Sequence, residues 1–391
     1  MIKMLSSTTS EICFPEDAVN EILKSLDLEN GLMKNSVGII SCHSDYVENG
    51  TVKDLCDKLP FDVVGYSTAA VATDDVYGQE NLNLAVLTSD DVNFRAAVSE
   101  SIRPGAVEKP IGDAYKKAAG ECSEKPKIAL VFLPFLLDVS GAVMMEYLGK
   151  IALDVPMFGT AACSSKLDNS ISYIIKNGSI AHDSAAFVLM EGNVSPKFFF
   201  TSIADDNMSD VGGKITESEE CLLKKVNDMT FVDFLDSCDI SSDAVRAAPS
   251  SLPLVIDRLD GTQPITAGIY SVTPEGYSHC GCYVPVGARV SFGRQDHNGI
   301  LQTVAVTVKN ALRATTMKAD ESGAILIFSC ISRLLLLGAQ FEDEMKKIVE
   351  LVDCKTPYQF SYSGGEICPA RDEKGTIFNR FHNFSCVACA L

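Results

Sequence analysis

The sequence predicts an α/β protein with α+β character, in which two domains are built from repeated β-α-β-β units and mixed sheets are flanked by helices. Three observations predict this fold class. One order of predicted elements recurs three times along the chain. The length of 391 residues suits two or three domains of about 150 residues each. A composition of 46% hydrophobic and 22% charged residues is typical of a globular protein.

Nine short runs rich in β-branched and aromatic residues are predicted to be the strands of the three copies. In groups of three per copy they are Val37–Cys42, Val63–Thr68 and Leu82–Leu87; Ile128–Leu133, Pro156–Ala161 and Ala185–Met190; and Ala324–Cys330, Tyr358–Ser363 and Phe384–Ala390. A proline opens or precedes each second strand, at Pro60, Pro156 and Pro357. There it ends the preceding helix without removing a hydrogen-bond donor from the sheet.

A helix is predicted between the first and second strands of every copy, near 50–58, 138–153 and 339–352. The last of these has the clearest periodicity. Its apolar residues are Phe341, Met345, Ile348 and Val352, at spacings of four, three and four, and charged residues occupy the other face. Each copy therefore predicts the order β-α-β-β.

The composition changes between the second and third copies. The segment Ser202–Asp243 is rich in Asp, Glu and Ser and contains a predicted helix at Ser218–Asp228, which suits a domain crossing. We therefore predict a boundary near residue 215. The predicted parts are a lead-in over 1–30, an N-terminal domain over 31–215 and a C-terminal domain over 216–391.

A further apolar section runs from Leu252 to Phe292 and is interpreted as a degenerate fourth unit with a shifted order of elements. Asp296 or Asn298 is expected to cap the helix predicted at Gly299–Arg313, because both side chains accept hydrogen bonds from a first helical turn.

Charge and targeting patterns restrict the cellular context. The fixed charges sum to 33 − 52 = −19, which argues against nucleic acid and anionic membranes as partners. The longest apolar run, Ile128–Leu137, is about half of the ~20 residues that a membrane span needs. Met1–Phe14 has neither the apolar core nor the cleavage site of an export signal. Many of the 14 cysteines lie in apolar runs, so we expect reduced thiols in a cytoplasmic protein without membrane insertion.

Several stretches of the sequence point to a family. They are AILIFSCISRLLLLG at Ala324–Gly338, FSYSGGEICP at Phe360–Pro369, FHNFSCV at Phe381–Val387, GYST at 65–68 and GCYVPVGARVSFG at 281–293. With them the chain resembles the FIST sensory family, with its N-terminal and C-terminal domains, from about residue 36 to the end. Ala69 and Ala70 depart from the family pattern, in which a glycine is expected soon after the Ser-Thr pair.

The resemblance implies a bacterial or archaeal signal-input protein that binds small molecules such as amino acids or their derivatives. Because this chain has no room for an output domain, it would signal to a separate protein, such as a histidine kinase or a chemoreceptor component. Some family members have been proposed to bind haem and sense nitric oxide, which is kept as an alternative.

Arg333 and Glu366 are the charged candidates for a ligand site. Arg333 follows a buried apolar run, and its planar guanidinium suits either a ligand carboxylate or an internal carboxylate such as Glu366. Glu366 follows Gly364 and Gly365, which permit a close approach of the backbone. It would receive the ammonium group of an amino acid while Arg333 binds the carboxylate. The other interpretation is a hairpin turn with a surface glutamate, and the resemblance favours the site.

Small polar residues at the ends of the second strands complete the expected site, because hydroxyl groups form directional hydrogen bonds without filling space. The ligand-binding set predicted beside Arg333, Glu366 and Gly365 comprises Ser67, Thr68, Thr160, Ser361, Ser363 and Asn383, and Ser164 lies in an equivalent place. For any single hydroxyl, turn formation is the competing role.

A metal site, haem binding and an enzymatic function are the alternatives to this ligand-binding site. His279-Cys280-Gly281-Cys282 has no second ligand pair at zinc spacing. A single haem ligand at His279, His297 or His382 would make a nitric-oxide sensor, although the C-x-x-C-H attachment motif is absent. The chain lacks G-x-S-x-G, Walker and dinucleotide motifs. We therefore expect no catalytic residue, metal or cofactor, with an enzyme of unknown reaction as a further alternative.

Overall fold

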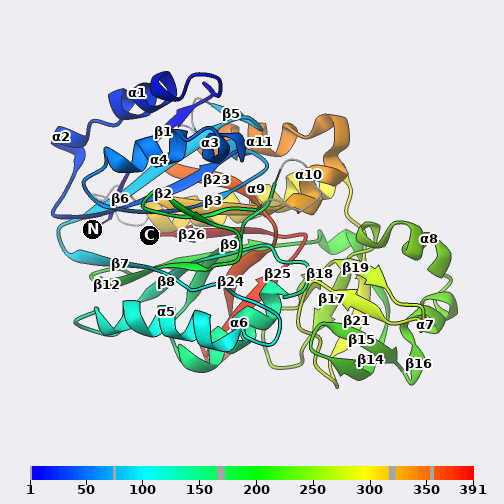
Figure 1. Ribbon diagram of the computed structural model, residues 1–391. Helices are drawn as coiled ribbons and strands as arrows, with labels where there is room; N and C mark the ends of the chain where they lie inside the picture. Colours follow the sequence, from blue (N-terminus) through cyan, green and yellow to red (C-terminus); the bar gives the residue numbers. More distant parts are fainter. Residues whose placement is uncertain (1, 74–75, 165–171, 317–322, 353–355) are drawn as a thin grey trace.

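The computed structural model describes residues 2–73, 76–164, 172–316, 323–352 and 356–391 (Figure 1). Each predicted copy forms one unit, in which the first strand pairs parallel to the second strand and antiparallel to the third. The strands of the units are β2 (Asn35–Cys42), β3 (Asp62–Ser67) and β6 (Leu82–Ser89); β8 (Ile128–Leu133), β9 (Met157–Ala161) and β12 (Ala186–Gly192); and β22 (Ile325–Cys330), β23 (Tyr358–Ser363) and β26 (Cys386–Ala390). The mixed α/β class and the repeated unit are confirmed.

The strand that follows each second strand leaves its own unit. β4 (Val71–Ala72) of the first unit pairs with β23. β10 (Ile174–Lys176) of the second unit pairs with β3, and β24 (Glu366–Arg371) of the third pairs with β9. This cyclic exchange interlocks the three units and buries the ends of their second strands at the centre of the molecule.

Helices cover the outer faces of the three sheets (Figure 1). In chain order they are α1 (Pro15–Ser25), α2 (Leu28–Gly31), α3 (Asp45–Glu48), α4 (Thr51–Asp57), α5 (Glu108–Gly120), α6 (Gly141–Ile151), α9 (His297–Thr316), α10 (Ile331–Leu337) and α11 (Asp343–Val352). α4, α6 and α11 are the helices predicted within the copies. α9 confirms its prediction, and Asp296 Oδ1 caps it by accepting from the amide of Gly299 at 2.8 Å. Within the described ranges no helix has the length and apolar character of a membrane span.

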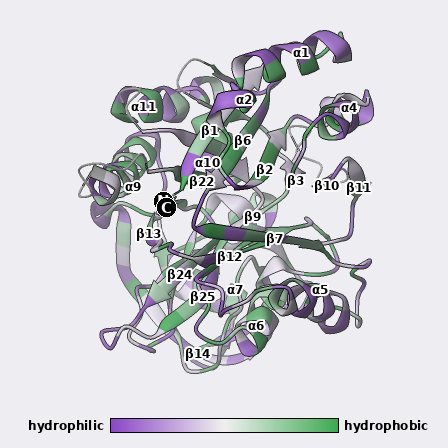
Figure 2. Cartoon of the chain, turned by 90° about the vertical axis from the view of Figure 1, so that its left-hand side faces the viewer, coloured by the Kyte–Doolittle hydropathy of each residue, from purple (hydrophilic) through white to green (hydrophobic). Residues whose placement is uncertain are grey.

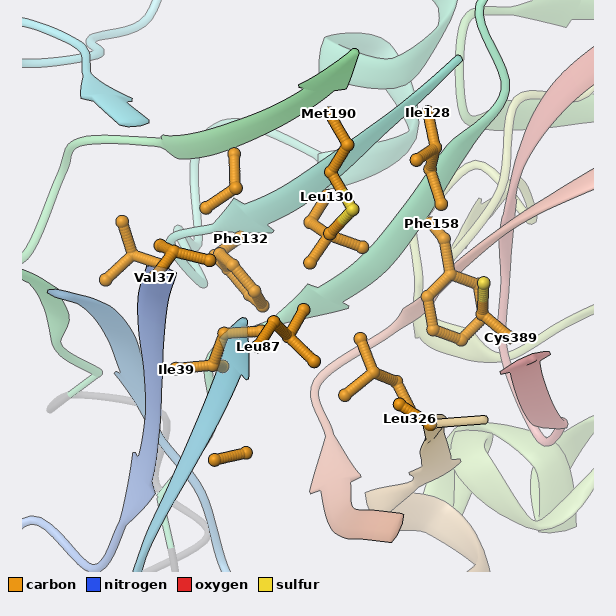
Figure 3. Packing of buried hydrophobic residues seen from close by; sticks show 14 of the residues in the cluster. Val37, Ile39, Leu87, Ile128, Leu130, Phe132, Phe158, Met190, Leu326 and Cys389 are labelled. Carbon is orange, nitrogen blue, oxygen red and sulfur yellow. The ribbon is translucent and has the colours of Figure 1, made fainter. Parts of the chain in front are cut away.

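The outer strands complete three six-stranded sheets. They are β1 (Lys3–Thr9), β5 (Tyr77–Gly78), β7 (Val92–Val98), β11 (Ser179–Ala181), β13 (Lys197–Thr201) and β25 (Ile377–His382). Apolar side chains from all three sheets meet in one core, which includes Val37, Ile39, Phe132, Phe158 and Leu326 (Figure 3). This shared burial supplies the main free energy that holds the units together.

An antiparallel β-domain is inserted between the second and third units (Figure 1). Its elements are β14 (Met208–Glu219), β15 (Leu222–Val226), β16 (Met229–Thr230), α7 (Phe231–Ser237), α8 (Ser242–Ala247), β17 (Leu254–Asp257), β18 (Ile265–Ala267), β19 (Ile269–Val272), β20 (Ser278–Cys280) and β21 (Arg289–Gly293). Short 3₁₀ turns lie at Asp205–Asn207, Pro249–Ser251 and Gly338–Gln340.

Two predictions for this region are wrong. The helix predicted at Ser218–Asp228 is a β-hairpin of β14 and β15, because the chain turns at Glu220, whose φ is 51°. The section is also no fourth β-α-β-β unit, because every described strand pair within it is antiparallel. Residue 215, the expected boundary, lies within β14.

Close packing of β8 against β9 generates a stability prediction. A Cβ atom at Gly159 would lie 1.8 Å from the carbonyl oxygen of Val131. We expect Gly159→Ala to lower the free energy of unfolding by roughly 3 kcal/mol, because overpacking forces the strands apart. Gly149→Ala in α6 is the control, since its Cβ meets nothing within 4 Å and alanine favours a helix. Equal stability of the two variants in urea would contradict this packing.

Candidate functional site

The predicted hydroxyl residues gather where the second strands end, and they bond across the units. The hydroxyl groups of Tyr66 and Ser361 lie 2.8 Å apart, and Thr160 donates to Ser363 at 2.6 Å. Thr68 donates to the carbonyl oxygen of Tyr362 at 2.7 Å. All of these side chains are buried. They connect residues that are distant in sequence, so their first role is to satisfy polar groups between the units.

Two further hydroxyl residues occupy the same buried region. Ser67 donates to the carbonyl oxygen of Cys163 at 2.9 Å and accepts from the amide of Tyr173 at 2.9 Å. Ser164 is buried just beyond β9. A ligand role for these hydroxyl groups stays a prediction, because a ligand would have to replace a hydrogen bond that the hydroxyl group already makes within the protein.

Arg333 lies on α10, is fully buried and forms an ion pair within the protein. Its Nε and Nη2 donate to Glu344 Oε1 at 2.9 and 2.7 Å. Its remaining N–H groups reach the Thr303 hydroxyl at 3.0 Å and the carbonyl oxygens of Ile300 at 2.9 Å and Phe384 at 3.5 Å. A guanidinium has five N–H donors, and this set engages all of them.

The partner of Arg333 is therefore Glu344 of α11 and not Glu366, which corrects the internal pair considered from the sequence. Glu344 also accepts from Ser329 at 2.9 Å and from the Tyr362 hydroxyl at 3.0 Å. Burial is the largest influence on the pKa of Arg333 and lowers it, but the charge and hydrogen bond of Glu344, together with Cys386 and Tyr362, raise that pKa above its usual value. Arg333 has no free donor with which to bind a ligand carboxylate.

Glu366 is the first residue of β24 and is fully buried. Its Oε2 accepts from the hydroxyl group and the amide of Ser385 at 2.7 and 3.3 Å. Its Oε1 has no hydrogen-bond partner among the described residues. Burial raises the pKa of this carboxyl to about 8, and the interactions with Ser385, Cys330 and Arg333 offset only part of that shift. Glu366 is thus a neutral carboxylic acid near neutral pH.

The surface-glutamate interpretation of the diglycine turn is wrong. The chain does not return as a hairpin after β23 but crosses to pair β24 with β9. Gly365 permits this crossing with a φ of 153°, and a Cβ there would lie 2.1 Å from the ring of Phe381. A glycine is required at this position to place Glu366 at the centre.

Arg333 and Glu366 have different ion-pair and hydrogen-bond partners, but both contact the same short stretch of backbone. Arg333 contacts the carbonyl oxygen of Phe384, and Glu366 accepts from Ser385, the next residue. The two predicted charges thus lie in one buried region. Of these two described side chains, Glu366 is the one with a polar atom that lacks a hydrogen-bond partner.

Asn383, Tyr270 and Cys330 complete the surroundings of Glu366. Asn383 Oδ1 accepts from the amide of Gly268 at 3.1 Å, which connects the inserted β-domain to the units. Tyr270 on β19 is 49% exposed as a residue, and it interacts electrostatically with Cys330 and Glu366. Burial raises the pKa of both Tyr270 and Cys330, so both groups stay protonated. We name Glu366, Ser385, Cys330, Asn383 and Tyr270 the central polar cluster.

The histidines considered as metal or haem ligands have other surroundings. Across the described residues, no three His, Cys, Asp or Glu side chains are grouped to hold a metal ion. His279 is exposed, while Cys280 and Cys282 beside it are buried. Burial lowers the pKa of His382 to about 4. His297 Nε2 lies 2.8 Å from Asp343.

The comparisons with known proteins identify the family. The FIST N domain matches residues 36–229 and the FIST C domain matches residues 233–369. These matches cover most of the chain, so it belongs to the FIST family, whose domains are associated with sensing in signal transduction. No curated protein matches the chain.

Two solved structures are similar at low identity. One is a crystal structure of cyanuric acid hydrolase from A. caulinodans, at 11% identity over 100% of this chain and 99% of that chain, with a TM-score of 0.37. Another cyanuric acid hydrolase, described as an evolutionary innovation by structural concatenation, shows 12% identity over 75% of this chain and 99% of that chain, with a TM-score of 0.28. Both TM-scores are low, so neither likeness carries an argument about this chain.

The buried ion pair generates a second stability prediction. Arg333→Met leaves the Glu344 carboxylate without its cation, and we expect it to lower the free energy of unfolding by roughly 3–5 kcal/mol. Lys53→Ala is the control, because it removes only an exposed pair with Asp57 and should leave stability nearly unchanged. Urea unfolding measures both variants. Indistinguishable free energies would show that the Arg333–Glu344 pair is not buried as described.

Glu366 generates a pH prediction. The usual pKa of 4.5 applies in the unfolded chain and about 8 in the folded protein, so the folded state binds the extra proton between these values. Its stabilisation is complete below about pH 4.5 and is lost as the pH rises through about 8. We expect the difference in free energy of unfolding between wild type and Glu366→Gln to change in this sense across that window. A difference that is constant with pH would mean that Glu366 is ionised when folded.

Proposed function

We propose that this FIST protein is a cytoplasmic, non-enzymatic sensor that reversibly binds an amino acid or a similar small zwitterion at the central polar cluster. It would pass the signal to a separate protein, such as a histidine kinase or a chemoreceptor component, and it would use no cofactor. The observation that carries this proposal is the unpartnered Oε1 of Glu366, which is fully buried.

Buried polar atoms almost always have a hydrogen-bond partner, so an unused carboxyl oxygen marks a place where a donor is missing. A ligand ammonium group is the donor that fits best. When it arrives, its charge favours the ionised form of Glu366, and the resulting hydrogen bond is charge-assisted. The carboxyl therefore exchanges its proton for a cationic ligand group.

The ligand carboxylate requires a partner other than Arg333. Moving Arg333 away from Glu344 would leave a buried carboxylate unpaired, which costs several kcal/mol. Tyr270 supplies a protonated hydroxyl group, and Asn383 supplies an amide. In this proposal these neutral donors bind the ligand carboxylate, which is the role that the sequence analysis assigned to Arg333.

The same residues suggest how binding becomes a signal. Tyr270 belongs to the inserted β-domain, and Asn383 joins that domain to the three units through Gly268 and Thr266. A ligand that contacts Tyr270 and Glu366 together binds more tightly to one arrangement of the domain than to others. That difference in affinity is what shifts the population and is available to a partner.

A thermal-shift screen over the standard amino acids tests this function. A ligand at about 100 times its Kd stabilises the folded state by about 2.7 kcal/mol, so we expect wild type to show a clear rise in Tm with at least one of them. Glu366→Gln should lose that rise, because an amide cannot pair with ammonium as an ion. Glu191→Gln is the control, since it makes the same change at a buried carboxyl whose Oε2 accepts from Ser123 and whose Oε1 lies 3.6 Å from the cation of Arg95.

A second arm uses the responding compound with its amino group replaced by a hydroxyl group, and we expect it to give no shift. Two results would refute the proposal. One is a wild-type protein that responds to none of the amino acids, and the other is a Glu366→Gln variant that responds as wild type does.

A further inference from the structure

A groove of about 620 Å³ is lined by residues of β13, the second half of β24 and α9. Figure 2 labels these three elements on its left side. The groove is separate from the central polar cluster and shares no residue with it. Its lining comes from the segments 196–201 and 369–371, with Gln263, Thr307 and Asn310. Its volume is within the range of natural binding sites.

Both long walls of the groove are strand edges. β13 pairs with β26 on one side and is the last strand of its sheet on the other. β24 pairs with β9 only at Glu366 and Ile367, so Cys368–Arg371 diverges from that neighbour. β13 and β24 pack near each other, but among the described residues the hydrogen bond that joins them is the long one from Cys368 Sγ to the Phe199 carbonyl oxygen, at 3.9 Å. Unpaired N–H and C=O groups of this kind accept an added strand.

The charge of the groove is opposite to that of the molecule. Lys197 and Arg371 are its charged lining residues, and both are exposed. The lining contains no acidic residue, although the chain carries a net charge of −19. The aromatic residues Phe198–Phe200 add an apolar wall. An incoming strand would therefore gain most if it carried carboxylates and apolar side chains in alternation.

We infer that this groove binds an extended, acidic segment of a partner protein, which adds to the edge of β13 as a further β-strand. Backbone hydrogen bonds to β13 supply affinity, while Lys197 and Arg371 select for acidic side chains. A second copy of this chain is a poorer occupant, because its own β13 would bring a second Lys197 to a cationic groove. The inference does not depend on Glu366 or on any amino-acid ligand.

The probe for this inference is an acetylated, fluorescein-labelled hexapeptide of alternating valine and glutamate. We expect fluorescence anisotropy to show binding and hydrogen exchange to show new protection within Lys197–Thr201. The double variant Lys197→Glu/Arg371→Glu should weaken binding by about tenfold or more. The matched control Lys109→Glu/Lys117→Glu reverses two exposed charges on α5 and should bind as wild type does.

Two altered peptides separate strand addition from simple charge attraction. N-methylation of alternate amides should abolish binding, because it blocks pairing with a strand edge, and lysine in place of glutamate should do the same. The inference is overturned if the glutamate peptide does not bind, if either altered peptide binds equally well, or if β13 is instead protected in a dimer of this chain that the peptide does not dissociate.

Discussion

The cyclic exchange of β4, β10 and β24 is the constraint on which the rest of the structure depends. Each second strand has its free edge covered by a short strand from another unit, so the three units can close their sheets only together. The strand ends are consequently buried at the centre, where polar groups must find partners in a different unit. The same exchange draws β24 away from β9 after Ile367, which opens the groove beside β13.

Two buried carboxyl groups near this centre differ in how completely their oxygens are hydrogen-bonded. Glu344 is surrounded by Arg333, Ser329 and the Tyr362 hydroxyl, so its charge is compensated and its oxygens are used. Oε2 of Glu366 accepts from Ser385, its Oε1 has no hydrogen-bond partner among the described residues, and burial keeps its proton in place. Where the internal partners end, Oε1 of Glu366 remains as the acceptor for the proposed ligand. The proposed site thus follows from an incomplete hydrogen-bond network.

The sequence predicted the strands and helices of the units because their patterns are local. Runs such as Ile128–Leu133 and Tyr358–Ser363 match the observed strands residue for residue. It did not predict the exchange, because β4 and β10 are too short to carry a pattern and their partners are distant in the chain. The predicted helix at 218–228 failed because a turn at Glu220 leaves no signature that distinguishes it from helix.

The candidate site was predicted only in part for the same reason. The diglycine before Glu366 indicated a close backbone approach, which the packing of Gly365 against Phe381 explains. The partner of Arg333 was missed because Glu344 lies beside Glu342 and Asp343, which are only half-buried, and Tyr270 was missed because it comes from the inserted domain. A crystal structure with the most stabilising amino acid tests the account most directly. It should place the ligand ammonium against Glu366 Oε1 with Arg333 still bound to Glu344, and a ligand bound away from Glu366 would contradict the account.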